Sequence, residues 1–235
     1  MNAQDWDRLA DAYAREVCDI FTRDRRGVIA RWLKSHGHFR GRRTVLDLGC
    51  GIGSFFRRYG RHFGTKTGSD HSTRMLQLAR RRCPDQPDIV WAQADIFALP
   101  ARWRASADLV VCANVLTFVA RGACRRALVQ VVRTLKPGGQ ALLIIPALES
   151  HEAVVALETG RPARHPPATA VVQRDDRRQR FFSAAGIAGL ARDSGLAKVQ
   201  IQKVWYPWVD EGITRVPRGA EPPWDWLVTG HRAIR

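Results

Sequence analysis

The chain has 235 residues, a formal net charge of +16 and five cysteines. A chain of this length can bury about 70% of its unfolded surface, so one α/β domain without cross-links is expected. The cysteines are odd in number, scattered and without a C-x-x-C pair, which argues against a disulfide framework or a metal site and favours a reducing, cytoplasmic location. The N-terminal residues show no secretory signal, and no apolar run is long enough to span a membrane.

Two amphipathic helices are predicted in the first 40 residues. In residues 3–21 the apolar side chains recur at helical spacing, which places them on one face. They are Trp6, Leu9, Tyr13, Val17 and Ile20. A second apolar stripe follows Gly27 and consists of Val28, Ile29, Trp32 and Leu33.

A short apolar run, Val45 to Leu48, is predicted to be a buried strand that carries Asp47. Three glycines follow at alternate positions, and a helix is expected to start at Ser54. The glycines are Gly49, Gly51 and Gly53, with Cys50 between the first two. A strand, a glycine turn and a helix N-terminus together suit a small ligand that bears a carboxylate or phosphate. The dinucleotide pattern G-x-G-x-x-G is excluded because Ser54 occupies the place of its last glycine, and a P-loop is excluded because no Lys follows.

Two further predicted strands also end at acids. Residues 65–69 form a weak strand that ends at Asp70, and residues 89–95 form a strand that ends at Asp95. Asp47, Asp70 and Asp95 therefore mark three successive strand ends. An acid at the end of the second strand is well placed to accept hydrogen bonds from a ribose diol.

The next apolar run, residues 107–116, is typical of a fully buried parallel strand. Asn114 and Val115 are expected at its carboxyl end, where ligands bind in open α/β sheets. An amphipathic helix is predicted over residues 121–135, and another buried strand over residues 140–145.

Three motifs resemble those of the class I S-adenosylmethionine (SAM)-dependent methyltransferases of the small-molecule type. They are D-x-G-x-G-x-G from Asp47, D-x-S-x-x-M-L from Asp70, in which Ser72 caps a helix, and L-K-P-G-G from Leu135. The resemblance covers residues 45–145. It implies a Rossmann-like α/β fold: a seven-stranded, mostly parallel sheet with an antiparallel last strand, helices on both faces and an N-terminal helical cap.

The resemblance also implies a cofactor, SAM, and its product S-adenosylhomocysteine (SAH). Asp47 would orient the methionine ammonium group, Asp70 would bind the ribose, and Asp95 the adenine amino group. The residues expected to contact SAM are Tyr13, Asp47, Gly49, Cys50, Gly51, Gly53, Asp70, His71, Met75, Asp95, Ile96, Asn114 and Val115. Alternatives stay open at three of them: Tyr13 and Met75 as packing residues, and Asp95 as an N-cap or a loop acid.

We expect a single methyltransferase domain over residues 1–235. Its parts are a helical cap (1–40), a SAM-binding core (41–145), a variable substrate-covering loop (146–182) and a C-terminal segment (183–235). The last segment is predicted to contain a helix capped by Ser183 and two strands, residues 197–205 and 226–232, which pair with each other antiparallel because their connection is too short for a crossover.

The predicted activity is transfer of a methyl group from SAM to an N, O or C nucleophile of a small molecule, an aromatic or anionic intermediate of specialised metabolism. The donor brings its own leaving group, so the protein mainly aligns the reactants and no obligatory catalytic residue is expected. His151 and Tyr13 are the candidate catalytic residues, although each is more often a surface or packing residue. No membrane partner is expected, and the chain is expected to be a monomer or homodimer.

Two other functions stay open. The basic charge favours an RNA or DNA methyltransferase, although the [DNS]-P-P-[YFW] motif of DNA amine methylation is absent at Asn114. The chain could also be a SAM-binding protein without transferase activity.

Overall fold

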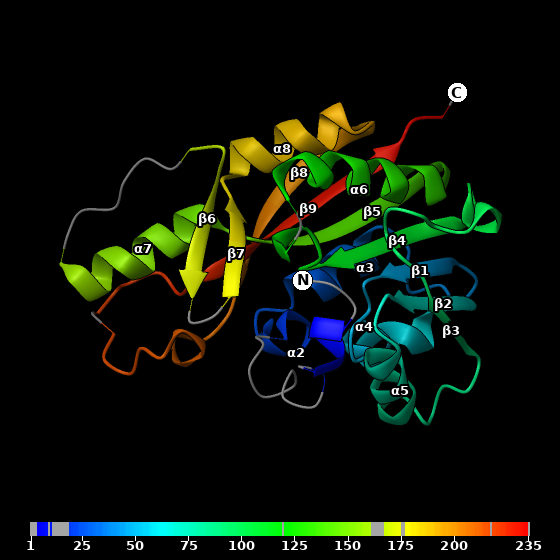
Figure 1. Cartoon of the computed structure of the whole chain (residues 1–235), viewed down its shortest axis with the longest axis horizontal. Coiled ribbons are helices and arrows are strands. Elements are labelled where there is room, and N and C mark those ends of the chain that lie inside the picture. The colour runs from blue at the N-terminus through cyan, green and yellow to red at the C-terminus, as the bar shows by residue number, and fades with distance from the viewer. Residues whose placement is uncertain are drawn as a thin grey trace.

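The computed structural model describes residues 4–8, 10, 19–118, 120–160, 167–174, 177–216 and 218–234. Its centre is a seven-stranded sheet with the strand order β3-β2-β1-β4-β5-β9-β8 (Figure 1). The strands are β1 (Thr44–Leu48), β2 (Thr65–Asp70), β3 (Ile89–Gln93), β4 (Ala107–Ala113), β5 (Leu135–Pro146), β8 (Leu196–Trp205) and β9 (Trp224–Arg232). Strands β1 to β5 pair in parallel, whereas β9 lies antiparallel between β5 and β8. The predicted sheet is confirmed.

Helices cover both faces of this sheet (Figure 1). They are α2 (Ile20–Arg23), α3 (Val28–Ser35), α4 (Ser54–Tyr59), α5 (Thr73–Arg82), α6 (Arg121–Thr134), α7 (Leu148–Thr159) and α8 (Ala184–Asp193), with 3-10 turns η1 (Gly60–His62), η2 (Ala101–Trp103), η3 (Leu116–Phe118) and η4 (Trp208–Glu211). Helices α6 and α8 bury one face of the sheet, and α2, α3 and α4 bury the other. We call the second face the α3 face.

The alternation of side chains along each strand assigns residues to the two faces. On β1, Val45 packs in the cluster of the α3 face, whereas Leu46 and Leu48 pack against α6 and α8. Asp47 therefore shares the α3 face with Val45. This places the acid of the glycine-turn motif beneath the N-terminal helices.

The N-terminal prediction holds in part. Residues 4–8 are helical, and α3 buries the four residues expected of the second helix. However, Asp19 has an extended backbone, and its side chain caps the separate helix α2 by accepting a hydrogen bond from the Phe21 amide. One helix over residues 3–21 is therefore wrong, because a side-chain cap at Asp19 starts a new helix there.

Strand β5 begins earlier than predicted. Leu135 already pairs with Ala107, and the register shifts before Leu109 pairs with Gln140. The residues between bulge out, with Gly138 at a φ of 76°. The L-K-P-G-G segment is therefore an irregular strand entry and not a separate turn, because glycine accepts the left-handed backbone that a bulge requires.

The prediction of a loop over residues 146–182 is wrong. This segment contains α7 and a two-stranded hairpin, β6 (Thr169–Arg174) and β7 (Arg177–Phe182), which lie together beyond the carboxyl end of β5 (Figure 1). The helix buries only Leu148, Ser150 and Val154, so its sequence has a weak apolar period. The hairpin is rich in Arg and Gln, and its pairing comes from backbone hydrogen bonds that composition does not reveal.

Candidate functional site

A pocket opens where β1 and β4 end, on the α3 face of the sheet. Four of the predicted residues line it: Asp47, Gly49, Cys50 and Asn114. Three others come from the start of α2, namely Asp19, Ile20 and Phe21. The sequence had not indicated Asp19 or α2 as a wall of this pocket.

The carboxylate of Asp47 lies at the base of this pocket and is only 2% exposed. No hydrogen bond to it comes from any residue that the structure describes. Burial raises the pKa of the Asp47 carboxyl well above its ordinary value, and the charge of Asp70 raises this pKa further. A buried carboxylate without donors is costly, so this arrangement suits a ligand that brings N–H donors and positive charge.

Asn114 presents a second unsatisfied acceptor at the same pocket. Its side-chain oxygen Oδ1 is buried and has no hydrogen-bond partner within the described chain. Its backbone has a φ of 58°, the left-handed conformation, and its amide donates to the Ile144 carbonyl oxygen at 2.9 Å. The turn after β4 thus fixes Asn114 at the pocket wall, and a left-handed Asn is typical of functional turns.

The glycine turn is held by β2. The Gly49 and Cys50 amides both donate to the Ser69 carbonyl oxygen, at 2.7 and 2.8 Å. The Asp70 carboxylate accepts a bond from the Gly51 amide through Oδ2 and one from the Ser72 amide through Oδ1, each at 2.9 Å. Burial raises the pKa of Asp70, and these two amides oppose that shift. Asp70 therefore ties the turn to the α5 entrance, a structural role that sequence reasoning missed.

Gly49 and Gly53 are required by their backbone and by close packing. Both have left-handed φ angles, 72° and 76°. A Cβ on Gly49 would lie 2.3 Å from Cγ2 of Val115, and one on Gly53 would meet Trp91 and Ala79 at 3.0 and 3.1 Å. The structure thus explains Gly53 by packing against α5 and β3, not by an approach to the pocket.

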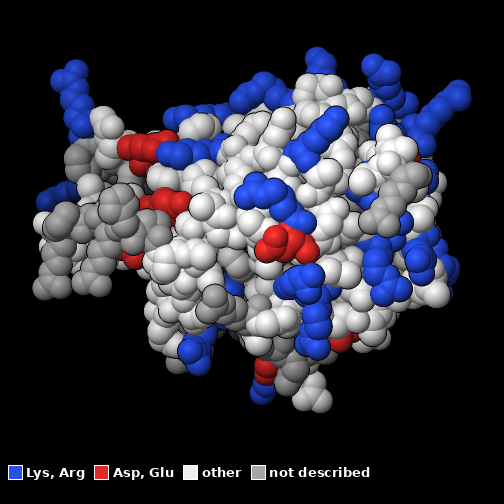
Figure 2. Space-filling model, turned by 90° about the horizontal axis from the view of Figure 1, so that it is seen from above, with Lys and Arg blue, Asp and Glu red and all other residues white. Residues whose placement is uncertain are grey.

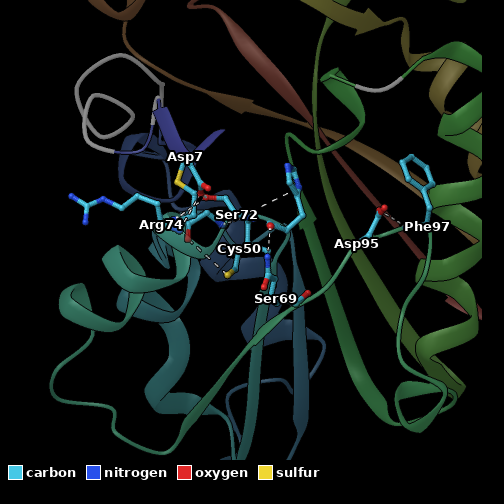
Figure 3. Close-up of polar contacts among 12 residues, drawn as sticks. Asp7, Cys50, Ser69, Ser72, Arg74, Asp95 and Phe97 are labelled. Atoms are coloured by element: carbon cyan, nitrogen blue, oxygen red, sulfur yellow. Dashed lines mark hydrogen bonds and ion pairs between the residues drawn. The ribbon is translucent and has the colours of Figure 1, made fainter. Parts of the chain in front are cut away.

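Asp95 lies apart from the cluster around Ser72 and faces Phe97 (Figure 3). It is exposed, and its Oδ1 accepts a hydrogen bond from the Phe97 amide at 2.9 Å. Ile96 is partly buried and packs with the cluster under α6 and α8. In this structure Asp95 therefore caps a loop, which is the alternative that the sequence had left open.

The N-terminal helix docks beside the turn. Asp7 accepts a hydrogen bond from the Ser72 hydroxyl and one from the Arg74 amide, the latter at 3.1 Å (Figure 3). Both bonds lower the pKa of Asp7, with that of Ser72 contributing most. Ser72 is the N-cap of α5, since its hydroxyl oxygen accepts a hydrogen bond from the Met75 amide. Asp7 of the N-terminal helix caps a second free amide of α5, that of Arg74.

Met75 and His71 lie along this contact. Met75 is buried in a small cluster with Ala10 and Ile52, so it fills the core between the helix and the turn. Nδ1 of His71 lies 4.0 Å from Oδ1 of Asp70. Tyr13, predicted both as a SAM contact and as a catalytic candidate, falls outside the described residues.

His151 lies on α7, away from the glycine turn. Its ring stacks on Phe181 of β7, with 4.8 Å between the ring centroids. On the same helix, the Glu149 carboxylate accepts hydrogen bonds from the Ala184 amide at the start of α8 and from Nε1 of Trp226. The structure therefore shows how α7 is fixed to α8 and β9, and it does not bring His151 together with Asp47.

The comparisons with known proteins agree with this architecture. Residues 45–139 match the family model described as a methyltransferase domain. The Ubiquinone biosynthesis O-methyltransferase of Paracidovorax citrulli (strain AAC00-1) is 35% identical over 111 residues, which are 46% of this chain and 45% of that protein. The chain thus spans about half the length of the curated relatives it matches.

Solved structures share the whole fold. The N-methyltransferase NodS from Bradyrhizobium japonicum WM9, solved with SAH, has a TM-score of 0.67 and 20% identity, covering 98% of this chain and 97% of NodS. The magnesium protoporphyrin IX methyltransferase of Synechocystis PCC 6803, also with SAH, has a TM-score of 0.64 and 16% identity, covering 99% and 95%. Residues 45–139 thus resemble a methyltransferase domain, and the whole chain shares its fold with these two methyltransferases.

The described residues contain no helix that is long and apolar enough to cross a membrane. They also contain no group of three or more side chains that could hold a metal ion.

Proposed function

We propose that the chain transfers a methyl group from SAM to a small molecule. The observation that carries this proposal is a pair of acceptors at one pocket, the Asp47 carboxylate and Asn114 Oδ1, to which no described residue donates a hydrogen bond. An ammonium group has three N–H donors and a positive charge, so the methionine end of SAM fits these two oxygens. The small-molecule reactions named for the curated relatives support the same class of acceptor.

The chain's own residues would position this cofactor. Asp47 and Asn114 would hold the ammonium group, and the glycine turn, fixed by Ser69 and Asp70, would admit the methionine backbone without a Cβ in the way. The ribose would reach the lone pairs of Asp70 that its two backbone hydrogen bonds leave available. Bound SAM supplies an activated methyl group, and the protein contributes alignment and the exclusion of water.

The acceptor is proposed to be an intermediate of specialised metabolism, held beside α7, β6 and β7, which lie beyond the carboxyl end of β5 (Figure 1). Figure 2 shows Lys and Arg side chains scattered over the face seen from above and not gathered in one stripe. We expect no retention of RNA or DNA at physiological salt, where binding through phosphates would have a steep salt dependence.

Calorimetric titration with SAM tests the cofactor assignment. Asp70→Ala is expected to weaken SAM binding by about 1–3 kcal/mol, because a ribose hydroxyl loses its charged acceptor. Asp95→Ala is expected to have an effect in the same range if its carboxylate turns from the Phe97 amide to the adenine amino group. Unchanged affinity in both variants would contradict the assignment. Methyl transfer from labelled SAM to a polynucleotide would contradict the small-molecule acceptor.

A further inference from the structure

The residue Asp225 has no role in the site described above. It lies near the start of β9, between Trp224 and Trp226, and it is only 7% exposed. Within the ranges that the structure describes, no donor makes a hydrogen bond to its carboxylate. Buried carboxylates in proteins are almost always hydrogen-bonded or paired, so Asp225 calls for a ligand or a function.

The side chain of Asp225 points to the same face of the sheet as Asp47. On β9, Trp224, Trp226 and Val228 pack with α6 and α8, whereas Leu227 packs in the cluster of the α3 face. Since successive side chains alternate, Asp225 shares the face of Leu227. Val204, its partner on β8, is buried in that same cluster.

The strand register relates Asp225 to the wall of the pocket. Ala113, in the pocket wall, pairs with Ile144, and Pro146, two residues further along β5, pairs with Asp225. Two strand spacings separate β4 from β9, which is about 10 Å across the sheet. Asp225 therefore lies on the same face of the sheet as the pocket, two strands away from Ala113 and two residues further toward the carboxyl end of β5.

The turn η4 covers this part of the sheet. The hydroxyl of Tyr206 donates to Oε1 of Glu211 at 2.7 Å, and Arg23 of α2 pairs with Asp210 at 3.3 Å. The Arg23 pair joins η4 to α2, the helix that also lines the SAM pocket. Helix α2 and the turn η4 are therefore joined above the pocket and the sheet surface at Asp225.

The electrostatics at Asp225 favour a cation. Burial raises the pKa of Asp225 to about 7, and the negative charge of Glu211 adds to this shift. Glu211 accepts the hydrogen bond from Tyr206, and Arg23 of α2 pairs with Asp210. A hydroxyl ligand would supply a hydrogen bond alone, whereas an ammonium ligand would supply both N–H donors and a positive charge to the buried carboxylate.

We propose that Asp225 binds the amino group of the methyl acceptor, so that the chain methylates an amine that arrives as its ammonium ion. This inference rests on the proposed methyltransferase function. It replaces the anionic acceptor that was one of the predictions from the sequence, because the buried side chain beside the site is a carboxylate.

In this reaction the Asp225 carboxylate acts as the base. The ammonium ion gives one proton to the Asp225 carboxylate, which frees the lone pair on nitrogen. Nitrogen then bonds to the methyl carbon, while the carbon–sulfur bond breaks and both of its electrons stay on sulfur. The product is a methylated ammonium ion, and the proton on Asp225 leaves to solvent.

A matched series of three ligands tests the charge that the site prefers. The full chain, alone and then saturated with SAH, is titrated with phenethylamine, 2-phenylethanol and 3-phenylpropionate. We expect the amine to bind at least 10-fold more tightly than the alcohol or the acid. We also expect the amine, at pH 7, to release protons in paired titrations with buffers of different ionisation enthalpy, because it stabilises the ionised Asp225.

Asp225→Asn is expected to remove both the preference and the proton release while SAH binds as before. Glu221→Gln is the matched control, since Glu221 is an acid on the adjacent surface that pairs with Lys203 at 2.7 Å, and it is expected to change neither. Three results would overturn the inference. The amine does not bind, the acid or the alcohol binds as tightly as the amine, or Asp225→Asn still prefers the amine. Failure to bind SAH would instead contradict the proposed function, and the amine titration of the chain alone would still decide the role of Asp225.

Discussion

Two regions at the carboxyl ends of the parallel strands are built in different ways. The glycine-turn side, from β1 to the start of α5 together with Asn114, consists mainly of short contiguous segments joined by backbone hydrogen bonds. The β9 side, which comprises α7, β6, β7, η4 and the start of β9, brings together residues from four separate parts of the chain. The proposed cofactor site therefore depends on local backbone geometry, whereas the proposed acceptor site depends on packing between segments that are far apart in the chain.

The β9 side is expected to give the largest effect, through the pH dependence of stability. Because the pKa of Asp225 is raised from 3.8 to about 7 by burial and by Glu211, the protonated form stabilises the fold. That stability is fully present below pH 3.8 and is lost as pH rises through about 7. Between pH 5 and 8.5 the wild type should therefore lose about 3 kcal/mol relative to Asp225→Asn.

Urea unfolding of both proteins at the two pH values measures this difference. The charged and titratable groups around Asp225, namely Glu211, Asp210, Arg23 and Tyr206, are the same in both proteins, so their contributions cancel. A stability difference that is equal at pH 5 and pH 8.5 would show that Asp225 titrates normally.

The glycine-turn side can be tested by a pair of glycines. Gly41 and Gly49 have nearly the same φ, 74° and 72°, but a Cβ on Gly49 would collide with Val115, whereas a Cβ on Gly41 would meet nothing within 4 Å. Gly41→Ala should lower the free energy of unfolding by about 1 kcal/mol, because alanine disfavours the left-handed backbone. Gly49→Ala should cost about 2 kcal/mol more, because it overpacks the turn. Chemical denaturation measures both, and equal losses would exclude the Val115 contact.

The smallest expected effect concerns the N-terminal helix, which docks on the glycine-turn side. Asp7→Ala removes the acceptor shared by Ser72 and the Arg74 amide and should cost about 1 kcal/mol, as a lost helix cap does. Asp5→Ala, two residues away, removes an ion pair with the exposed Arg8 and should cost less than about 0.5 kcal/mol. Thermal unfolding compares the two variants. A larger loss for Asp5→Ala would contradict the cap.

The sequence predicts the glycine-turn side well because its signals are local. Apolar runs, alternate glycines and Ser72 three residues before Met75 define strands, turn and cap, and the structure confirms each of them. The sequence did not reveal that Asp70 binds the turn amides, that Asp7 caps α5, or that Asn114 is left-handed, because these depend on contacts between segments far apart in the chain.

The β9 side was predicted poorly for the same reason. The weak apolar period of α7 and the arginines of β7 conceal regular structure that is fixed by Glu149 and Trp226. One signal was available: Asp225 is an acid inside the apolar run from Trp224 to Val228, directly before the segment 226–232 that is predicted to be a strand. A charge in such a run indicates a functional position or a buried partner.

The pocket at Asp47 is tested most directly by calorimetric titration of the full chain with SAH. We expect the wild type to bind and Asp47→Asn to bind about 10- to 100-fold more weakly, since a charged acceptor for the ammonium group is lost. The exposed Asp85, beyond α5, provides the control Asp85→Asn, which should bind as the wild type does. A wild-type chain that does not bind SAH, or an Asp47→Asn variant with unchanged affinity, would contradict the assignment of this pocket to the methionine end of SAM.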